Sequence, residues 1–130
     1  MLNKFMYKLL FFILVGHVFS NDQGEIIEFM SSNPFSFYDI ITNLENEIDQ
    51  EVYGTLRFPD NLNKNNLPMV LGINGSKNWA SHHLEYLAMF REMGYATFEL
   101  HSFNSRNVKS TVGSQTQVTT AMMILDAYRA

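Results

Sequence analysis

Three adjacent residues, Asn74, Gly75 and Ser76, are the candidates for ligand binding in this sequence. They follow the apolar run at residues 68–73, which begins at Pro68 and is typical of a strand buried on both faces, as in parallel sheets. Open α/β sheets bind their ligands beyond the carboxyl ends of such strands. The pattern therefore predicts a binding loop at residues 74–76.

Two further groups of residues resemble metal ligands, but their spacing argues against a metal site. His82 and His83 are adjacent, so on a helix they point about 100° apart and cannot chelate one ion as residues i and i+4 can. The acidic residues between 45 and 51 lack the glycine at the sharp turn of a calcium loop, which favours a solvated charged run. We expect no metal and no cofactor.

The elements that position the loop form a strand, helix and strand unit. Ser81 is a suitable N-cap and Gly94 a suitable C-terminal residue for a helix between them. A second apolar strand is predicted at residues 95–100, and a further amphipathic helix at residues 115–130. Upstream, residues 51–58 alternate in polarity, which predicts an antiparallel strand with one solvated face, and residues 25–29 suggest a short edge strand.

Composition limits the class of protein and its partners. The 130 residues carry a net charge of −4, and such a surface does not attract phosphate backbones, so we expect no nucleic-acid partner. The chain has no cysteine, so no disulfide supports its fold. A composition that is 46% hydrophobic and 14% aromatic can supply a packed core instead.

The first 20 residues have the layout of a secretory signal. Lys4 and Lys8 precede the apolar run at residues 9–15, and cleavage is predicted after Ser20. The run is shorter than the roughly 20 apolar residues that span a bilayer. We therefore expect an exported, periplasmic or secreted protein with no stable membrane span after cleavage, and a mature part at residues 21–130 whose length suits one small domain.

Residues 54–130 resemble the N-terminal half of dienelactone hydrolase-type proteins of the α/β-hydrolase superfamily. The most specific part is residues 102–130, where several separated residues match in order. The matching features are Tyr-Gly-x-Leu-x-x-Pro at 53–59, Gly-Ser at 75–76, Met-Gly-Tyr-Ala at 93–96, Ser-Phe-x-x-Arg at 102–106, Thr-Val-x-x-Gln-x-Gln-Val at 111–118 and Asp-Ala-Tyr-Arg-Ala at 126–130.

This resemblance implies a partial α/β-hydrolase fold, with a mostly parallel sheet and flanking helices, truncated before the nucleophile elbow. It implies acyl transfer on a small ester or lactone substrate by a serine or, less commonly, cysteine nucleophile with Asp and His. No Gly-x-Ser-x-Gly and no cysteine is present, so we expect no catalytic residue in this chain and no hydrolysis by it. The resemblance also assigns the backbone N–H groups of Gly75 and Ser76 to half of an oxyanion hole.

Three other residues are expected to organise loops or to meet the substrate. Asn74 stands where the family commonly has His, and His101 stands where it commonly has Asp. Arg106 matches the family pattern, and it either anchors its loop or meets an anionic group. The departures leave two hypotheses open: an exported hydrolase of which this is the N-terminal portion, or a non-catalytic α/β-hydrolase-like binding protein.

Overall fold

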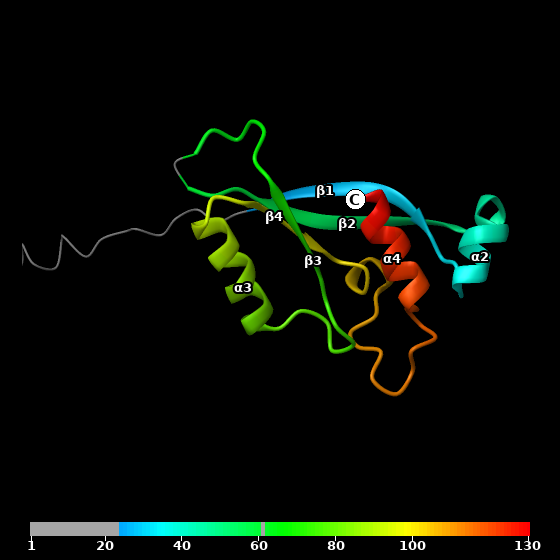
Figure 1. Cartoon of the computed structure of the whole chain (residues 1–130). Coiled ribbons are helices and arrows are strands. Elements are labelled where there is room, and N and C mark those ends of the chain that lie inside the picture. Colours follow the sequence, from blue (N-terminus) through cyan, green and yellow to red (C-terminus); the bar gives the residue numbers. More distant parts are fainter. Residues whose placement is uncertain (1–23, 61) are drawn as a thin grey trace, which may run out of the picture.

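A four-stranded mixed sheet is the centre of the molecule (Figure 1). The computed structural model describes residues 24–60 and 62–130, so the expected signal sequence lies outside the described residues. The strand order is β1-β2-β4-β3, in which β1–β2 and β2–β4 are antiparallel and β3–β4 is parallel. The strands are β1 (Glu25–Ser32), β2 (Asp49–Arg57), β3 (Met69–Ile73) and β4 (Ala96–Leu100).

The prediction of a mostly parallel α/β-hydrolase sheet is wrong. Only the β3–β4 pair is parallel, because β2 lies between β1 and β4 and runs antiparallel to both. The strand expected to be buried on both faces, β3, instead lies at one edge of the sheet, where Met69 is 51% exposed and Ile73 is 45% exposed. The strand that is buried along its whole length is β4.

The predicted strand, helix and strand unit is confirmed. Helix α3 (Ser81–Glu92) connects β3 to β4, and Gly94 follows it with a φ of 92°, which a residue with a side chain rarely adopts. The N-cap is Ala80 and not the predicted Ser81. Ala80 has no side-chain acceptor for the N–H groups of the first turn. The start of the helix is stabilised instead by a hydrogen bond from the Ala80 N–H to Nδ1 of His83 at 3.1 Å.

Two helices cover opposite faces of the sheet. Gly72 faces Leu87 of α3, whereas the preceding residue, Leu71, packs in a cluster with Ala127 of α4 (Thr120–Arg129). Successive strand residues point to opposite faces, so α3 and α4 lie on opposite sides. The remaining helical elements are α2 (Phe37–Thr42), η1 (Leu44–Asn46) and η2 (Asn104–Arg106).

The last helix begins later than its apolar pattern predicts. The amphipathic pattern starts at residue 115, but α4 starts at Thr120, because the side chain of Thr119 accepts a hydrogen bond from the N–H of Met122 at 3.2 Å and caps the helix. Residues 115–118 therefore belong to the loop before the helix. Among the described residues, no helix is long and apolar enough to cross a membrane.

Candidate functional site

The loop after β3 lies where the sequence predicts it, at the carboxyl end of the strand. Asn74 is buried, and its Nδ2 donates a hydrogen bond to the carbonyl of Gly75 at 3.1 Å. The same carbonyl accepts from the N–H of Asn78 at 2.8 Å, which closes the turn. The carbonyl of Ser76 accepts from the N–H of Thr111 at 2.9 Å. The carbonyl groups of Gly75 and Ser76 therefore both accept hydrogen bonds from within the protein.

The N–H group of Ser76 donates no hydrogen bond to any residue that the structure describes, whereas Gly75 forms an isolated antiparallel bridge with Asn78, which places the Gly75 N–H opposite the Asn78 carbonyl. Both residues are exposed, and a Cβ built on Gly75 meets no atom within 4 Å. An N–H group that no protein acceptor uses, on an exposed loop, is what an acceptor oxygen of a ligand needs. The backbone at Ser76 can therefore bind a carbonyl or carboxylate oxygen.

A pocket of about 510 Å³ borders this loop. Asn74, Gly75 and Ser76 form one wall, and Phe103 and Val118 belong to the apolar remainder of the lining. The volume lies in the range of small-molecule sites, which are mostly apolar with a few polar groups. No aspartate, glutamate, histidine, lysine or arginine is found among the described residues that line it.

The walls of the pocket are fixed by contacts between distant segments. The segment before α2 reaches the pocket because the hydroxyl of Thr119 donates to the carbonyl of Pro34 at 3.1 Å. Ser36 then caps α2 by accepting from the N–H of Asp39, whose carboxylate in turn accepts from the Ser36 N–H at 2.7 Å. Sequence reasoning did not place residues 35–37 at the site, because their approach depends on contacts with α4.

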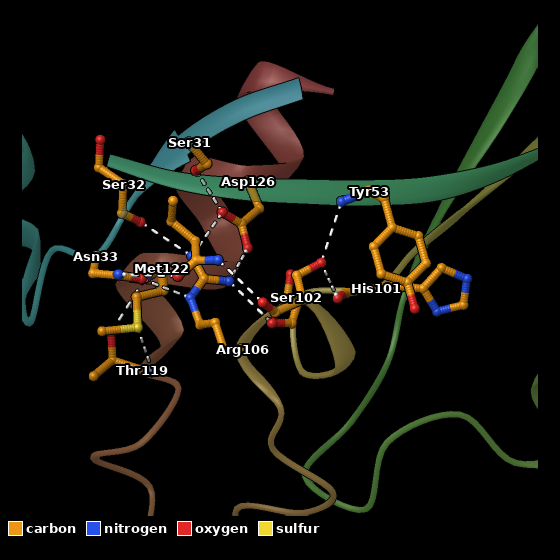
Figure 2. A network of polar contacts seen from close by, with 12 residues as sticks. Ser31, Ser32, Asn33, Tyr53, His101, Ser102, Arg106, Thr119, Met122 and Asp126 are labelled. Carbon is orange, nitrogen blue, oxygen red and sulfur yellow. Dashed lines mark hydrogen bonds and ion pairs between the residues drawn. The ribbon is translucent and has the colours of Figure 1, made fainter. Parts of the chain in front are cut away.

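His101 and Arg106 are not brought to the pocket. The ring of His101 stacks on Tyr53 (Figure 2), with ring centroids 4.8 Å apart. Its Nε2 lies 2.9 Å from Oγ1 of Thr55. Its side chain therefore lies on the sheet, beside residues of β2. Trp79 also contacts this histidine edge-on and donates from Nε1 to the carbonyl of Leu100 at 2.9 Å, which ties the binding loop to the end of β4.

The side chain of Arg106 is an internal anchor. It is 5% exposed and forms a two-pronged ion pair with Asp126 of α4, at 2.7 and 3.1 Å. Ser31 of β1 donates a short hydrogen bond to the same carboxylate. The other guanidinium bonds go to Oδ1 of Asn33 and to the carbonyls of Ser32 and Ser102 (Figure 2).

The sequence leaves two partners open for Asp126, an exposed ion pair with Arg129 or a donor from a loop, and the structure shows the second. Asp126 is fully buried, and its partner is Arg106, 20 residues earlier, and not Arg129. The pair joins β1, η2 and α4 behind the pocket. The pattern that could have indicated this is an acidic residue placed among the apolar positions of an amphipathic helix, since a buried carboxylate requires a partner.

Three buried polar atoms at the ends of β3 and β4 have no hydrogen-bond partner within the described part of the chain. They are Oδ1 of Asn74, Nδ1 of His101 and Oγ of Ser102. Because Ile73 pairs with Leu100, all three residues follow neighbouring strand ends. A buried polar group without a partner costs about 1–3 kcal/mol. The carboxyl end of the parallel pair is therefore the place where an additional hydrogen-bonding group lowers the free energy.

Acid is expected to destabilise the fold through His101. Burial lowers the pKa of His101 below its ordinary value of 6.5, Glu99 opposes this shift, and Arg57 adds to it. The unfolded chain takes up the proton first, so the free energy of unfolding should fall as the pH drops from about 6.5 to about 5. Urea unfolding at several pH values across this range measures the free energy of unfolding. His101→Asn should flatten the profile, whereas substitution of the exposed His82 by Asn should not; equal slopes would contradict the assignment.

No cluster of three or more metal-ligating side chains occurs in the described ranges. Comparisons with models of protein families, with curated proteins and with solved structures give no match. The function is therefore inferred from the pocket, the exposed loop at Gly75 and Ser76 beside it and the uncharged lining.

Proposed function

We propose that this chain binds the carbonyl group of a small ester or lactone in the pocket beside Gly75 and Ser76. The observation that carries the proposal is the N–H group of Ser76, which donates to no described residue and lies, beside the exposed Gly75, at the edge of a mostly apolar pocket. The Ser76 N–H would hold the carbonyl oxygen, and Phe103 and Val118 would contact the apolar part of the ligand. Such a hydrogen bond also stabilises the negative charge that develops on that oxygen in acyl transfer.

Acyl transfer itself needs groups that the lining does not supply. A serine hydroxyl becomes nucleophilic when a base accepts its proton, and no titratable side chain is found among the described lining residues. We therefore propose that the chain contributes the binding and oxyanion part of an ester or lactone hydrolase, with nucleophile and base provided outside this pocket lining. The alternative, a non-catalytic binding protein, is favoured by the same uncharged lining and by Asn74 in place of His.

Gly75→Ala is expected to weaken ligand binding about threefold to tenfold, the equivalent of one neutral hydrogen bond. The new methyl group enters the open space in front of the loop and hinders approach to the Ser76 N–H group, while the fold has room for it. Binding of the aryl lactone dihydrocoumarin can be followed by the fluorescence of Trp79, the single tryptophan, which lies next to the loop.

The matched control for this measurement is Lys77→Ala. Lys77 is exposed on the same loop and is absent from the pocket lining, so the affinity should not change. Equal affinities of Gly75→Ala and the unaltered chain would contradict the proposed site. Turnover of 4-nitrophenyl butyrate above the buffer rate, lost in Ser76→Ala, would show instead that the chain is itself catalytic.

We also propose that the protein is exported, on the strength of the charge and apolar pattern at residues 1–20. The expected result in a bacterial host is a periplasmic or secreted product that begins at Asn21. N-terminal sequencing of that product tests the cleavage position. Retention of Lys4 and Lys8 in the mature protein would contradict the proposal.

A further inference from the structure

Helix α2 presents its apolar side chains to solvent. Phe37, Tyr38 and Ile41 are 50%, 72% and 81% exposed, and no residue of the helix is buried. Their spacing of three and four residues puts them side by side on the helix surface. We call these three residues the α2 patch. Helix α2 protrudes at one side of the molecule, at the end of the sheet remote from α3 (Figure 1).

The α2 patch contributes little buried area to this fold, because half or more of each side chain is exposed. A helix of six residues is far shorter than the length at which an isolated helix is stable in water, and most helices are held by packing of their apolar face. Here the capping contacts of Ser36 with Asp39 hold the first turn, while the apolar face meets water. Three large apolar side chains that are exposed together mark an interaction surface.

The charge around the α2 patch indicates what kind of partner covers it. Residues 35–51 contain five acidic side chains and no lysine or arginine. Within the described residues, Glu45 and Asp49, both exposed, form no ion pair. Acidic groups beside an apolar surface attract a partner that carries basic and apolar side chains together, because complementary charges speed association and set the orientation.

Two other occupants fit this surface less well. A second copy of the chain would bring the same five acidic side chains against this one, and like charges placed together at an interface cost several kcal/mol. A lipid surface would accept the aromatic and aliphatic side chains, but anionic lipid headgroups attract basic segments and repel acidic ones. The charge therefore favours a basic protein segment.

We propose that the α2 patch is a docking site for a basic amphipathic segment of a partner protein. Its apolar side chains pack on Phe37, Tyr38 and Ile41, and its lysine or arginine side chains meet the acidic residues of the segment 35–51. Amphipathic helices are commonly recognised in this way, through a few apolar anchor residues surrounded by a charged rim. Phe37 also lines the pocket, so Tyr38 and Ile41, which do not, distinguish this docking site from the ligand site.

The test is the binding of a fluorescent Leu/Lys amphipathic helical peptide to the purified chain, measured by anisotropy. Ile41→Ser and Tyr38→Ser are each expected to weaken binding about tenfold, as anchor residues do. Glu45→Gln combined with Glu47→Gln should weaken it about threefold at low salt and have little effect at high salt. Because Tyr38, Ile41 and Glu45 are exposed and Glu47 is partly exposed, the variants should keep the melting temperature of the unaltered chain.

The controls separate this surface from general stickiness. Tyr128→Ser removes an aromatic side chain that is 88% exposed on α4, and Glu85→Gln removes an exposed charge on α3; neither should alter binding. A matched Leu/Glu peptide should not bind. Equal loss in the control variants would overturn the proposal. So would α2-dependent binding to zwitterionic vesicles in place of the peptide, or a dimer that Ile41→Ser dissociates.

Discussion

Replacing Asp126 with Ala is expected to lower the free energy of unfolding by about 3–5 kcal/mol. The substitution leaves the guanidinium of Arg106, which is 5% exposed, without its carboxylate, and it removes the acceptor of the Ser31 hydroxyl. A buried cation cannot recover its hydration there, so the loss exceeds that of an exposed ion pair. Urea unfolding, with the midpoint and slope compared with those of the unaltered chain, measures the change.

The double variant Arg106→Met and Asp126→Leu distinguishes a buried charge from a lost contact. Removing both charges leaves no buried cation without its carboxylate, so the double variant should be more stable than Asp126→Ala alone. If it were less stable, the hydrogen bonds of Arg106 to the carbonyls of Ser32 and Ser102 would be the dominant contribution. Both results are read from the same unfolding curves.

The ion pair also links the fold to the proposed site. Arg106 holds the carbonyl of Ser102, which directly precedes the pocket residue Phe103, and Asp126 belongs to the helix that carries Ala121 and Met123 into the lining. Asp126→Ala should therefore loosen the pocket walls at temperatures where the fold persists. Arg106 and Asp126 contact no residue of the binding loop 74–76, so the effect of Asp126→Ala on binding is indirect.

The local elements were predictable because each depends on short-range patterns. The apolar runs that became β3 and β4 are bounded by Pro68 and Gly94, and the alternation at residues 51–58 matches β2. The sheet order was not predictable from these patterns. Alternation shows that a strand has two unlike faces, but pairing of β2 with β4 rests on contacts about 45 residues apart, such as Thr55 with Glu99.

The exposure of the polar face of β2 was not predictable from its residue types either. The sequence predicted a solvated face at Tyr53, Thr55 and Arg57, but Thr55 is 7% exposed. Its hydroxyl meets His101, and Arg57 forms an ion pair with Glu99 at 2.7 Å. Polar side chains from two strands satisfy one another beneath α3, so polarity alone did not indicate exposure.

The candidate site was predictable on one side only. The loop 74–76 follows from the strand before it and from the general position of ligand sites in α/β sheets. The opposite walls come from α4 and from the segment before α2, whose approach is set by the contacts of Thr119 and Arg106 with the end of β1. Those contacts join residues more than 70 positions apart, and no local pattern encodes them.

Phe103→Ala is expected to lower the free energy of unfolding by about 3–5 kcal/mol, because it removes a phenyl ring that is 1% exposed. The ring packs with Val118 and Met122 in the second core cluster, which holds the start of α4 against the end of β4. The effect should appear as a lower urea midpoint with an unchanged slope. Phe37→Ala is the control, since Phe37 is 50% exposed and should change stability by less than about 1 kcal/mol.

The same substitution tests whether the pocket and the core share a wall. Phe103 belongs both to the core cluster and to the pocket lining, so the volume freed by the ring adds to the pocket. Dihydrocoumarin should bind more weakly through the lost aromatic contact, while a lactone with a bulkier aryl group should lose less affinity or gain some. An equal loss for both lactones would mean that Phe103 supports the fold without shaping the space that the ligand occupies.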